Sequence, residues 1–260
     1  MHPPVRSLSR GLKLLQELNA NGPSSAQNLG RRTDVNRTTV YRLLATLADD
    51  GFVSFDGKSG LFSLTPHVRQ LSEGLTVRDE SSQAAVPAMF KLLGQVNWPS
   101  DFAVFDMGSL VIRESTHPFS LLSIHRDMIG RRRSLLRSAL GRAILTAAEP
   151  NLRREMLEIT AAYAPEDAAM AGDRRFVADL ILQTERDGYA SSVGETERTI
   201  SAIALPILKG KRVIGSLNLI FFSSSMTPRK AASRYLSHLR SAVASIEARL
   251  SSSAQPATPI

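Results

Sequence analysis

The chain contains no cysteine, so disulfide bridges, thiolate–metal sites and cysteine nucleophiles are excluded. Long hydrophobic runs are missing too, because no stretch reaches the roughly 18 uninterrupted apolar residues of a membrane span. The first residues, MHPPVRSLSRG, lack the apolar segment of a secretory signal. We therefore expect a cytoplasmic protein with no membrane partner.

The signatures of common catalytic sites are also missing. The sequence has no glycine-rich phosphate loop, no G-x-S-x-G elbow and no H-E-x-x-H motif, and no acidic cluster of the nuclease type. His117 and His125 would be able to meet Glu114 across strands as a metal site, but isolated histidines more often have structural roles. We predict a non-enzyme without cofactor or metal; the alternative is a DNA-associated or small-molecule-binding enzyme.

Positive charge is plentiful and unevenly placed. The 260 residues carry a net charge of +8 and are 43% hydrophobic, which is typical of a folded globular chain of one or two domains. Four arginines lie between Arg31 and Arg42, where Asp34 is the single acid. This concentration favours a polyanionic partner for the N-terminal part.

The segment NRTTVYRLLATL, residues 36–47, predicts a helix with two distinct faces. Asn36 is a suitable N-cap, and the apolar residues recur at helical spacing on the inner face: Val40, Leu43, Leu44 and Leu47. The outer face carries Thr38, Tyr41, Arg42 and Ala45, which suit the base edges of a DNA major groove. Taken alone, the segment fits an ordinary surface helix equally well.

The neighbouring segments place this helix in a larger motif. A first helix is marked by Leu8, Leu12, Leu15 and Leu18 and should stop near residues 21–23; Ser24 or Ser25 can cap a second. Residues 52–55 and 61–64 read as a hairpin around a glycine-containing turn. The order predicts a winged helix-turn-helix, with Lys58 at the wing tip either near a phosphate or merely solvated.

Three runs, VRSLSRGLKLLQEL, TTVYRLLATLADDGFV and LFSLTPHVRQLSEG, resemble the IclR-type bacterial transcription regulators. The likeness covers roughly residues 5–250 and departs at Asn36, where many members carry proline. It implies a DNA-binding domain over residues 1–65, a connecting helix and linker over 66–80, an effector-binding domain over 81–250 and a disordered tail over 251–260.

Within that arrangement we assign roles on the DNA. The outer-face residues Thr38, Tyr41, Arg42 and Ala45 would face bases, whereas phosphate contacts would come from Arg37, Thr39, Ser25 and Gln27. Arg31 and Arg32 would either do the same or lie in a solvated turn. One such domain covers a short half-site, so the expected partners are double-stranded operator DNA and further copies of the chain, as a homodimer or tetramer.

The C-terminal part predicts an α+β domain with an antiparallel sheet. Strands are expected at residues 102–105, 110–115, 121–125, 189–193, 200–207 and 213–222, and helices at 82–96, 138–148, 151–159, 174–187 and 227–250. Pro87 is acceptable in the first helix only near its first turn. Strands at both ends with helices between them match the GAF-like effector domain that the resemblance implies.

The resemblance also implies effector contacts. The segments IGRRRSLLRSALGRAIL and RDGYASSVGETERTISAIALPIL match the family, and its effector-holding positions correspond to Ser192, Ala202 and Asn218. Acidic residues common near the first of these are missing, which favours an anionic ligand.

Further segments, NWPSDFAVFD and VIRESTHPFSLLSIHRDMIGRR, resemble the activators of phenylpropionate catabolism. This implies a small aromatic carboxylic acid as effector and, for an activator, RNA polymerase as a partner. Arg113 and Arg126 are equal candidates for the carboxylate anchor, each with a surface or interface ion pair as the alternative. The run Arg131–Arg133 is expected to be a solvated loop or a subunit contact.

Overall fold

The computed structural model describes residues 3–71 and 80–252, which form two compact units divided between residues 78 and 79. Each unit has its own hydrophobic core. The predicted connecting segment over residues 66–80 falls mostly outside the described residues: Pro66–Arg69 form a 3₁₀ helix, η1, and residues 72–79 are not described. No helix in the described parts of the chain is both long and apolar enough to cross a membrane.

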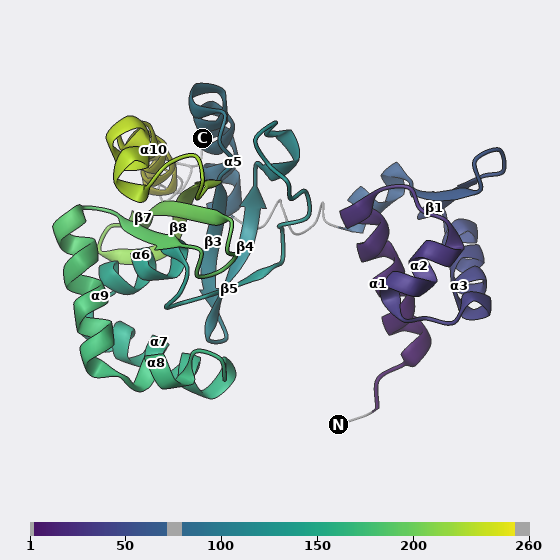
Figure 1. Cartoon of the computed structure of the whole chain (residues 1–260), viewed down its shortest axis with the longest axis horizontal. Coiled ribbons are helices and arrows are strands. Elements are labelled where there is room, and N and C mark those ends of the chain that lie inside the picture. Colours follow the sequence, from purple (N-terminus) through teal and green to yellow (C-terminus); the bar gives the residue numbers. More distant parts are fainter. Residues whose placement is uncertain (1–2, 72–79, 253–260) are drawn as a thin grey trace, which may run out of the picture. The chain divides into compact units, whose positions relative to one another are not determined.

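The N-terminal unit is three helices followed by a two-stranded hairpin (Figure 1). Its elements are α1 (Arg6–Asn21), α2 (Ala26–Thr33), α3 (Arg37–Asp49), β1 (Val53–Asp56) and β2 (Leu61–Leu64). Ser25 caps α2, since its Oγ accepts from Asn28 N at 3.3 Å, and Asn36 caps α3, since its Oδ1 accepts from Thr38 N at 2.9 Å. The backbone of Ser24 adds a bridge to Phe62 in β2, which ties the hairpin to the start of α2.

The buried stripe of α1 differs from the expected one. Gly11, Leu14 and Leu18 are buried, whereas Leu8 and Leu12 are 63% and 50% exposed. The helix carries two apolar stripes roughly 100° apart. The stripe through Leu14 is buried, and Leu15 on the other stripe packs partly buried against the same core, whereas Leu8 and Leu12 lie at the surface. Leucine spacing alone did not distinguish them.

The C-terminal unit is built on one antiparallel sheet of six strands in the order β5-β4-β3-β8-β7-β6. The strands are β3 (Asp101–Asp106), β4 (Ser109–Ser115), β5 (Arg132–Ser134), β6 (Ala190–Val193), β7 (Ile200–Lys209) and β8 (Arg212–Phe222). The central strands β3 and β8 pair with each other although they lie near opposite ends of this unit in the sequence, so the sheet depends on long-range pairing.

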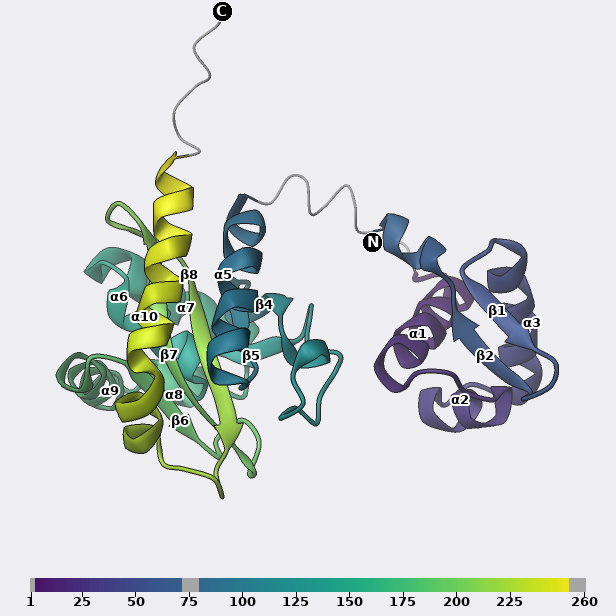
Figure 2. The same ribbon diagram turned by 90° about the horizontal axis from the view of Figure 1, so that it is seen from above.

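Helices cover both faces of this sheet. On one face α5 (Glu80–Val96) and α10 (Pro228–Ser252) lie side by side (Figure 2) and bury a core that includes Trp98 and Phe221. On the other face a second core is shared by α6 (Ala139–Ala147), α7 (Pro150–Tyr163), α8 (Ala168–Gly172) and α9 (Arg174–Asp187). The architecture is the predicted α+β fold with an antiparallel sheet.

Three local expectations are corrected. Residues 121–125 form no strand; they belong to an irregular segment in which Leu121 is fully exposed. The strand that follows β4 in the chain and pairs with it is instead β5. Pro87 lies inside α5 rather than in its first turn, with its ring exposed, where water can satisfy the freed carbonyl. Ser251 and Ser252, assigned to the disordered tail, extend α10; residues 253–260 lie outside the described residues.

Candidate DNA-reading face and effector cavity

The outer face of α3 brings together the four residues expected to face bases. Thr38, Tyr41, Arg42 and Ala45 are all exposed, while Val40 and Leu44 on the opposite side are buried. The Asn36 cap fixes where the helix begins. The result is a short, firmly anchored helix with a polar surface.

Tyr41 links this surface to its surroundings. The guanidinium carbon of Arg37 lies 5.6 Å from the centre of the Tyr41 ring, a cation–π distance. The edge of the same ring meets Phe62 in the hairpin, with centroids 6.4 Å apart. Tyr41 is therefore oriented by two neighbours and still 46% exposed.

The residues expected near phosphates surround this face unevenly. Gln27 and Lys58 are exposed, Thr39 is half-buried, and the Ser25 hydroxyl is already used as the α2 cap. Lys58 lies in the hairpin turn, which Asp56 organises by accepting from Lys58 N at 2.9 Å and from Ser59 Oγ at 2.6 Å.

The turn arginines differ in their contacts. Arg31 is exposed at the end of α2. Arg32 donates to Glu17 on α1 at 3.1 Å, which gives it an intramolecular ion pair in place of a purely solvated position.

The C-terminal unit holds a small cavity of about 50 Å³ on the α6 side of the sheet. Its walls come from β3, β5, β6, β7, β8, the start of α6 and two loops, with the residues Asp101, His117, His125, Met128, Arg133, Ser138, Ala139, Leu140, Ser192, Thr196, Glu197, Ile200, Ala202, Asn218 and Ile220. Three of the five expected effector residues, Ser192, Ala202 and Asn218, therefore lie together in its wall.

The two arginines expected to anchor a carboxylate do not line this cavity. Arg113 is the extra residue at a β-bulge, because Ala103 pairs with Ile112 and the next pair is Phe102 with Glu114. A bulge displaces a residue from regular alternation. Arg126 is exposed in the loop and donates to the carbonyl of Pro118 at 3.1 Å.

Arg133 lines the cavity, although the run Arg131–Arg133 was expected to be a solvated loop or a subunit contact. It lies in β5, paired with the buried Leu110, whereas Arg132 turns to the surface and pairs with Asp106 at 3.1 Å. Among the described residues the guanidinium of Arg133 reaches only the Arg132 carbonyl at 3.2 Å and the Met128 sulfur at 3.9 Å. Successive side chains of a strand point to opposite faces, so Arg132 and Arg133 point in opposite directions. The sequence did not reveal this, because no strand was predicted there.

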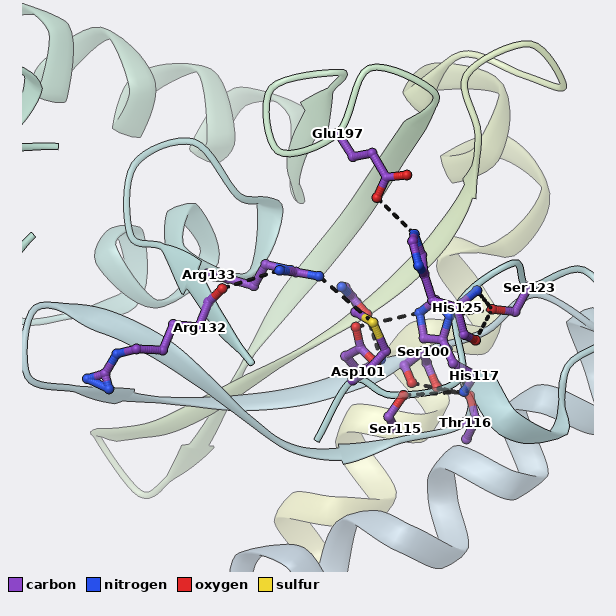
Figure 3. Close-up of polar contacts among 12 residues, drawn as sticks. Ser100, Asp101, Ser115, Thr116, His117, Ser123, His125, Arg132, Arg133 and Glu197 are labelled. Carbon is purple, nitrogen blue, oxygen red and sulfur yellow. Dashed lines mark hydrogen bonds and ion pairs between the residues drawn. The ribbon is translucent and has the colours of Figure 1, made fainter. Parts of the chain in front are cut away.

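Asp101 and His117 form a buried polar pair beside Arg133 (Figure 3). Asp101 Oδ2 lies 3.7 Å from His117 Nε2. Burial raises the pKa of Asp101 to about 6, against hydrogen bonding from Ser115 and the charge of Arg133. Burial also lowers the pKa of His117 to about 4, reinforced by the nearby His125 and Arg133. Both ionisable groups are thus held against their charged forms.

A second histidine, His125, also lies in the cavity wall. His125 Nε2 lies 2.8 Å from Glu197 Oε2, which joins the loop before β5 to the loop after β6. The imidazole rings of His117 and His125 are 6.2 Å apart. No group of three histidine or acidic side chains in the described parts of the chain is arranged to hold a metal ion.

Comparison with known families assigns both units. Residues 7–57 match the IclR helix-turn-helix domain, and residues 80–248 match the family described as bacterial transcriptional regulator IclR C-terminal. These are families of transcription regulators and not of enzymes.

Individual relatives are distant but extend over most of the chain. The HTH-type transcriptional regulator Rv1719 of Mycobacterium tuberculosis is 26% identical over 211 residues, covering 80% of this chain and 79% of that protein. The Pca regulon regulatory protein of Pseudomonas putida is 25% identical over 235 residues, covering 89% and 79%. A crystal structure of an IclR homolog from Microbacterium hydrocarbonoxydans, complexed with 4-hydroxybenzoate, matches with a TM-score of 0.63, 22% identity and coverage of 95% and 99%.

Two family matches that together span most of the chain, with the same two-part fold in a solved structure, support one conclusion. The protein belongs to the IclR family of DNA-binding bacterial transcription regulators with a C-terminal effector domain.

Proposed function

We propose that the outer face of α3 enters the major groove of operator DNA. Thr38, Tyr41, Arg42 and Ala45 contact base edges there, and the phosphate contacts come from Ser25, Gln27, Arg37, Thr39 and Lys58. The observation that carries this proposal is the exposure of all four base-facing residues on one face of a capped helix.

Footprinting of the DNA upstream of the regulated operon tests this proposal. Paired recognition helices of a dimer, or of a dimer of dimers, should protect two half-sites of a pseudo-palindrome. Protection of a single site, with a monomer in solution, would contradict the paired arrangement.

We also infer that the cavity binds a small aromatic carboxylic acid whose carboxylate lies on Arg133. The supporting observation is a guanidinium whose hydrogen-bond partners among the described residues are one carbonyl oxygen and one sulfur, at a cavity that also has apolar walls, formed by Met128, Leu140 and Ile220. The resemblance to activators of phenylpropionate catabolism and the distant homolog complexed with 4-hydroxybenzoate favour an aromatic acid. The free space of about 50 Å³ is small for an aromatic ring, so binding requires the cavity to widen.

Calorimetric titration with 3-phenylpropionate, benzoate and pyruvate tests the effector class. Arg133→Met should abolish binding, whereas Arg126→Ala, which removes an exposed arginine of the same region, should leave it unchanged. If pyruvate binds and both aromatic acids fail, the effector is an aliphatic acid. If Arg133→Met binds the acids as tightly as the wild type, the anchor is misassigned.

We further propose that the regulator activates an aromatic-acid catabolic operon through contact with RNA polymerase. Effector binding shifts the balance between arrangements of the paired α3 helices. A reporter fused to the operon should rise in the presence of effector and protein; a reporter that rises when the protein is deleted would make it a repressor.

A further inference from the structure

We propose that Phe55, on the hairpin of β1 and β2, inserts its ring into the DNA minor groove next to the major groove that α3 occupies, and partly unstacks one base step there. The inference rests on the proposed function, in which the outer face of α3 reads base edges. It adds a contact that responds to how easily the flanking DNA deforms, which α3 does not sense.

Phe55 is a large apolar side chain at the edge of the N-terminal core. It follows the buried Val53 by two residues in β1, so both side chains point to the same face of the hairpin. Val53 and Phe62 belong to the core, whereas Phe55 is 56% exposed. A single exposed apolar side chain is common on protein surfaces, so the neighbours of Phe55 decide what it contacts.

Two ring contacts connect Phe55 to the outer face of α3. Phe55 is paired in register with Phe62, and their ring centroids lie 4.6 Å apart with 37° between the ring planes. Phe62 in turn meets the edge of the Tyr41 ring, with the centroids 6.4 Å apart. The exposed rings of Tyr41 and Phe55 therefore flank one buried ring, and the aromatic surface continues from the helix onto the hairpin.

The width of the major groove determines which part of the DNA the hairpin meets. A helix with its side chains is about 10–12 Å across and the groove is about 12 Å wide, so α3 fills it. In both views of the N-terminal unit the hairpin turn lies next to α3, on the side away from α1 (Figures 1 and 2). An element beside α3 lies over the phosphate strand that borders the major groove, and the minor groove follows directly.

The charged residues of the hairpin fit this placement. Lys58 is exposed in the turn, where it can contact the bordering phosphate strand. Asp56 follows Phe55 and points to the opposite face of the strand. Its carboxylate accepts from Lys58 N at 2.9 Å and from Ser59 Oγ at 2.6 Å, so it organises the turn. The hairpin thus presents its ring on one face and its carboxylate on the other.

An apolar wedge in the minor groove leaves a characteristic trace in the DNA. The ring loses its contact with water, one base step is partly unstacked, and the duplex kinks toward the major groove. Pyrimidine–purine steps such as TA and CA unstack most easily. Recognition by Phe55 therefore depends on the deformability of one flanking step, whereas recognition by α3 depends on base edges.

Fluorescent operator duplexes test the wedge with the wild-type protein. In them, 2-aminopurine replaces one adenine at a time, on either strand, across the flanks of the half-sites that footprinting defines. Its fluorescence rises when a neighbouring base unstacks, and we expect a rise at one flanking TA or CA step. Fluorescence resonance energy transfer between the duplex ends should show a bend of roughly 20–90°. Unchanged fluorescence at every flanking position would overturn the inference.

The sequence of the flanking step provides a second test. Replacing the step by a stiff A-tract should weaken binding on the order of 10-fold, because the deformation then costs more. A preference for thymine at one position, without unstacking or bending, would place the ring on a thymine methyl group in the major groove. That result would also overturn the inference.

Substitutions assign the signal to the side chain. Phe55→Ser should lower operator affinity on the order of 10- to 100-fold, as for the loss of a buried phenylalanine, and should remove the fluorescence rise. Phe55→Leu keeps an apolar wedge and should retain part of both effects. The matched control is Phe52→Leu, at the other end of the hairpin, where the Phe52 ring lies 4.8 Å from that of His67; it should change neither.

A structural role of Phe55 gives a different result. A Phe55→Ser protein that binds more weakly, but still unstacks the step and bends the DNA as the wild type does, would make Phe55 a packing residue of the hairpin and overturn the inference. If Phe55→Ser does not fold, the wild-type fluorescence scan still decides.

The outcomes separate the two proposals. If Arg42→Ala loses operator selectivity but the wild type gives no fluorescence rise at any flanking position, base reading by α3 stands and the wedge fails. If the wild-type protein protects no operator, the proposed base reading by α3 fails, and the wedge fails with it.

Discussion

Individual side chains of α3 and of the cavity wall differ in their contacts and exposure. Arg37 stacks on Tyr41, so it helps to hold the reading face, whereas the exposed Arg42 projects from that face. In the cavity wall, the cationic Arg133 lies beside the buried pair Asp101 and His117. These differences predict a distinct effect for each substitution.

Replacing Arg42 by alanine should reduce specific operator binding by roughly 10- to 100-fold, because a bidentate contact to a base discriminates by about 1–3 kcal/mol. Fluorescence anisotropy with the operator and a scrambled duplex measures the loss of selectivity. Lys13→Ala, an exposed change on α1, is the matched control. If the Arg42 variant keeps its selectivity, Arg42 does not read a base.

Replacing Lys58 should have a different signature, since a phosphate contact carries no sequence information. Lys58→Ala should weaken operator and scrambled DNA alike and reduce the salt slope by about one. The measurement is the affinity for both duplexes over a range of salt concentrations. A loss confined to the operator would place Lys58 on a base instead.

Asp101 and His117 should give opposite dependences of stability on pH. The folded pKa of Asp101, about 6, lies above its unfolded value, so its contribution is complete at low pH and is lost as pH rises through 6. The folded pKa of His117, about 4, lies below its unfolded value, so its contribution is present above roughly pH 6.5 and lost on acidification toward 4. In the wild type the two largely offset each other.

Removing one group should expose the slope of the other. Between pH 6.5 and 4, Asp101→Asn should lose stability on acidification more steeply than the wild type, whereas His117→Asn should lose less or gain, each by about 3 kcal/mol at most. Denaturant unfolding at several pH values measures both. Parallel curves for all three proteins would contradict the assignment.

Among the elements, α6 depends on a glycine for its close approach to the preceding turn. A Cβ on Gly141 would lie 2.2 Å from the carbonyl oxygen of Leu135, so a side chain there requires the backbone to move. Gly141→Ala should therefore destabilise the C-terminal unit by about 3 kcal/mol. Gly94 in α5 has nothing within 4 Å of the corresponding position, so Gly94→Ala should instead stabilise by about 0.5 kcal/mol. Thermal unfolding compares the two, and equal effects would contradict the packing argument.

Elements defined by local signals were predictable, and those defined by distant pairing were not. The Asn36 cap and the spacing through Leu44 sufficed for α3, and Pro228 after Thr227 sufficed for the start of α10. Strand β5 was missed because its three residues are a strand only through pairing with β4. The place of Arg133 in the cavity wall was missed with it, because the sequence of an arginine run does not show which side chain points inward. The resemblance supplied Ser192 and Asn218 for the cavity wall, but the Asp101–His117 pair depends on burial that spacing does not reveal.

On the scale of the whole molecule, the two units have separate cores and are linked through residues outside the described ranges. We expect two unfolding transitions in calorimetry. An effector at 100 times its dissociation constant should stabilise the C-terminal unit by about 2.7 kcal/mol and leave the other transition in place. Leu44→Ala, in the N-terminal core, should lower only the N-terminal transition. A single transition that shifts as a whole in both experiments would contradict this independence.

The Asn218 side chain takes the place of a backbone partner for the Asp101 amide where β3 and β8 diverge. This has a consequence for how ligand preference evolves. Ala202 and Ile220 are apolar residues of the cavity wall, so exchanges of their side chains can change the room for a ligand while the backbone pairing of the sheet is preserved. A change at Asn218 alters ligand contacts and strand joining together and needs a compensating change in the same lineage. Divergence among regulators with this architecture should therefore be gradual at the apolar wall and rare, in paired steps, at the polar end.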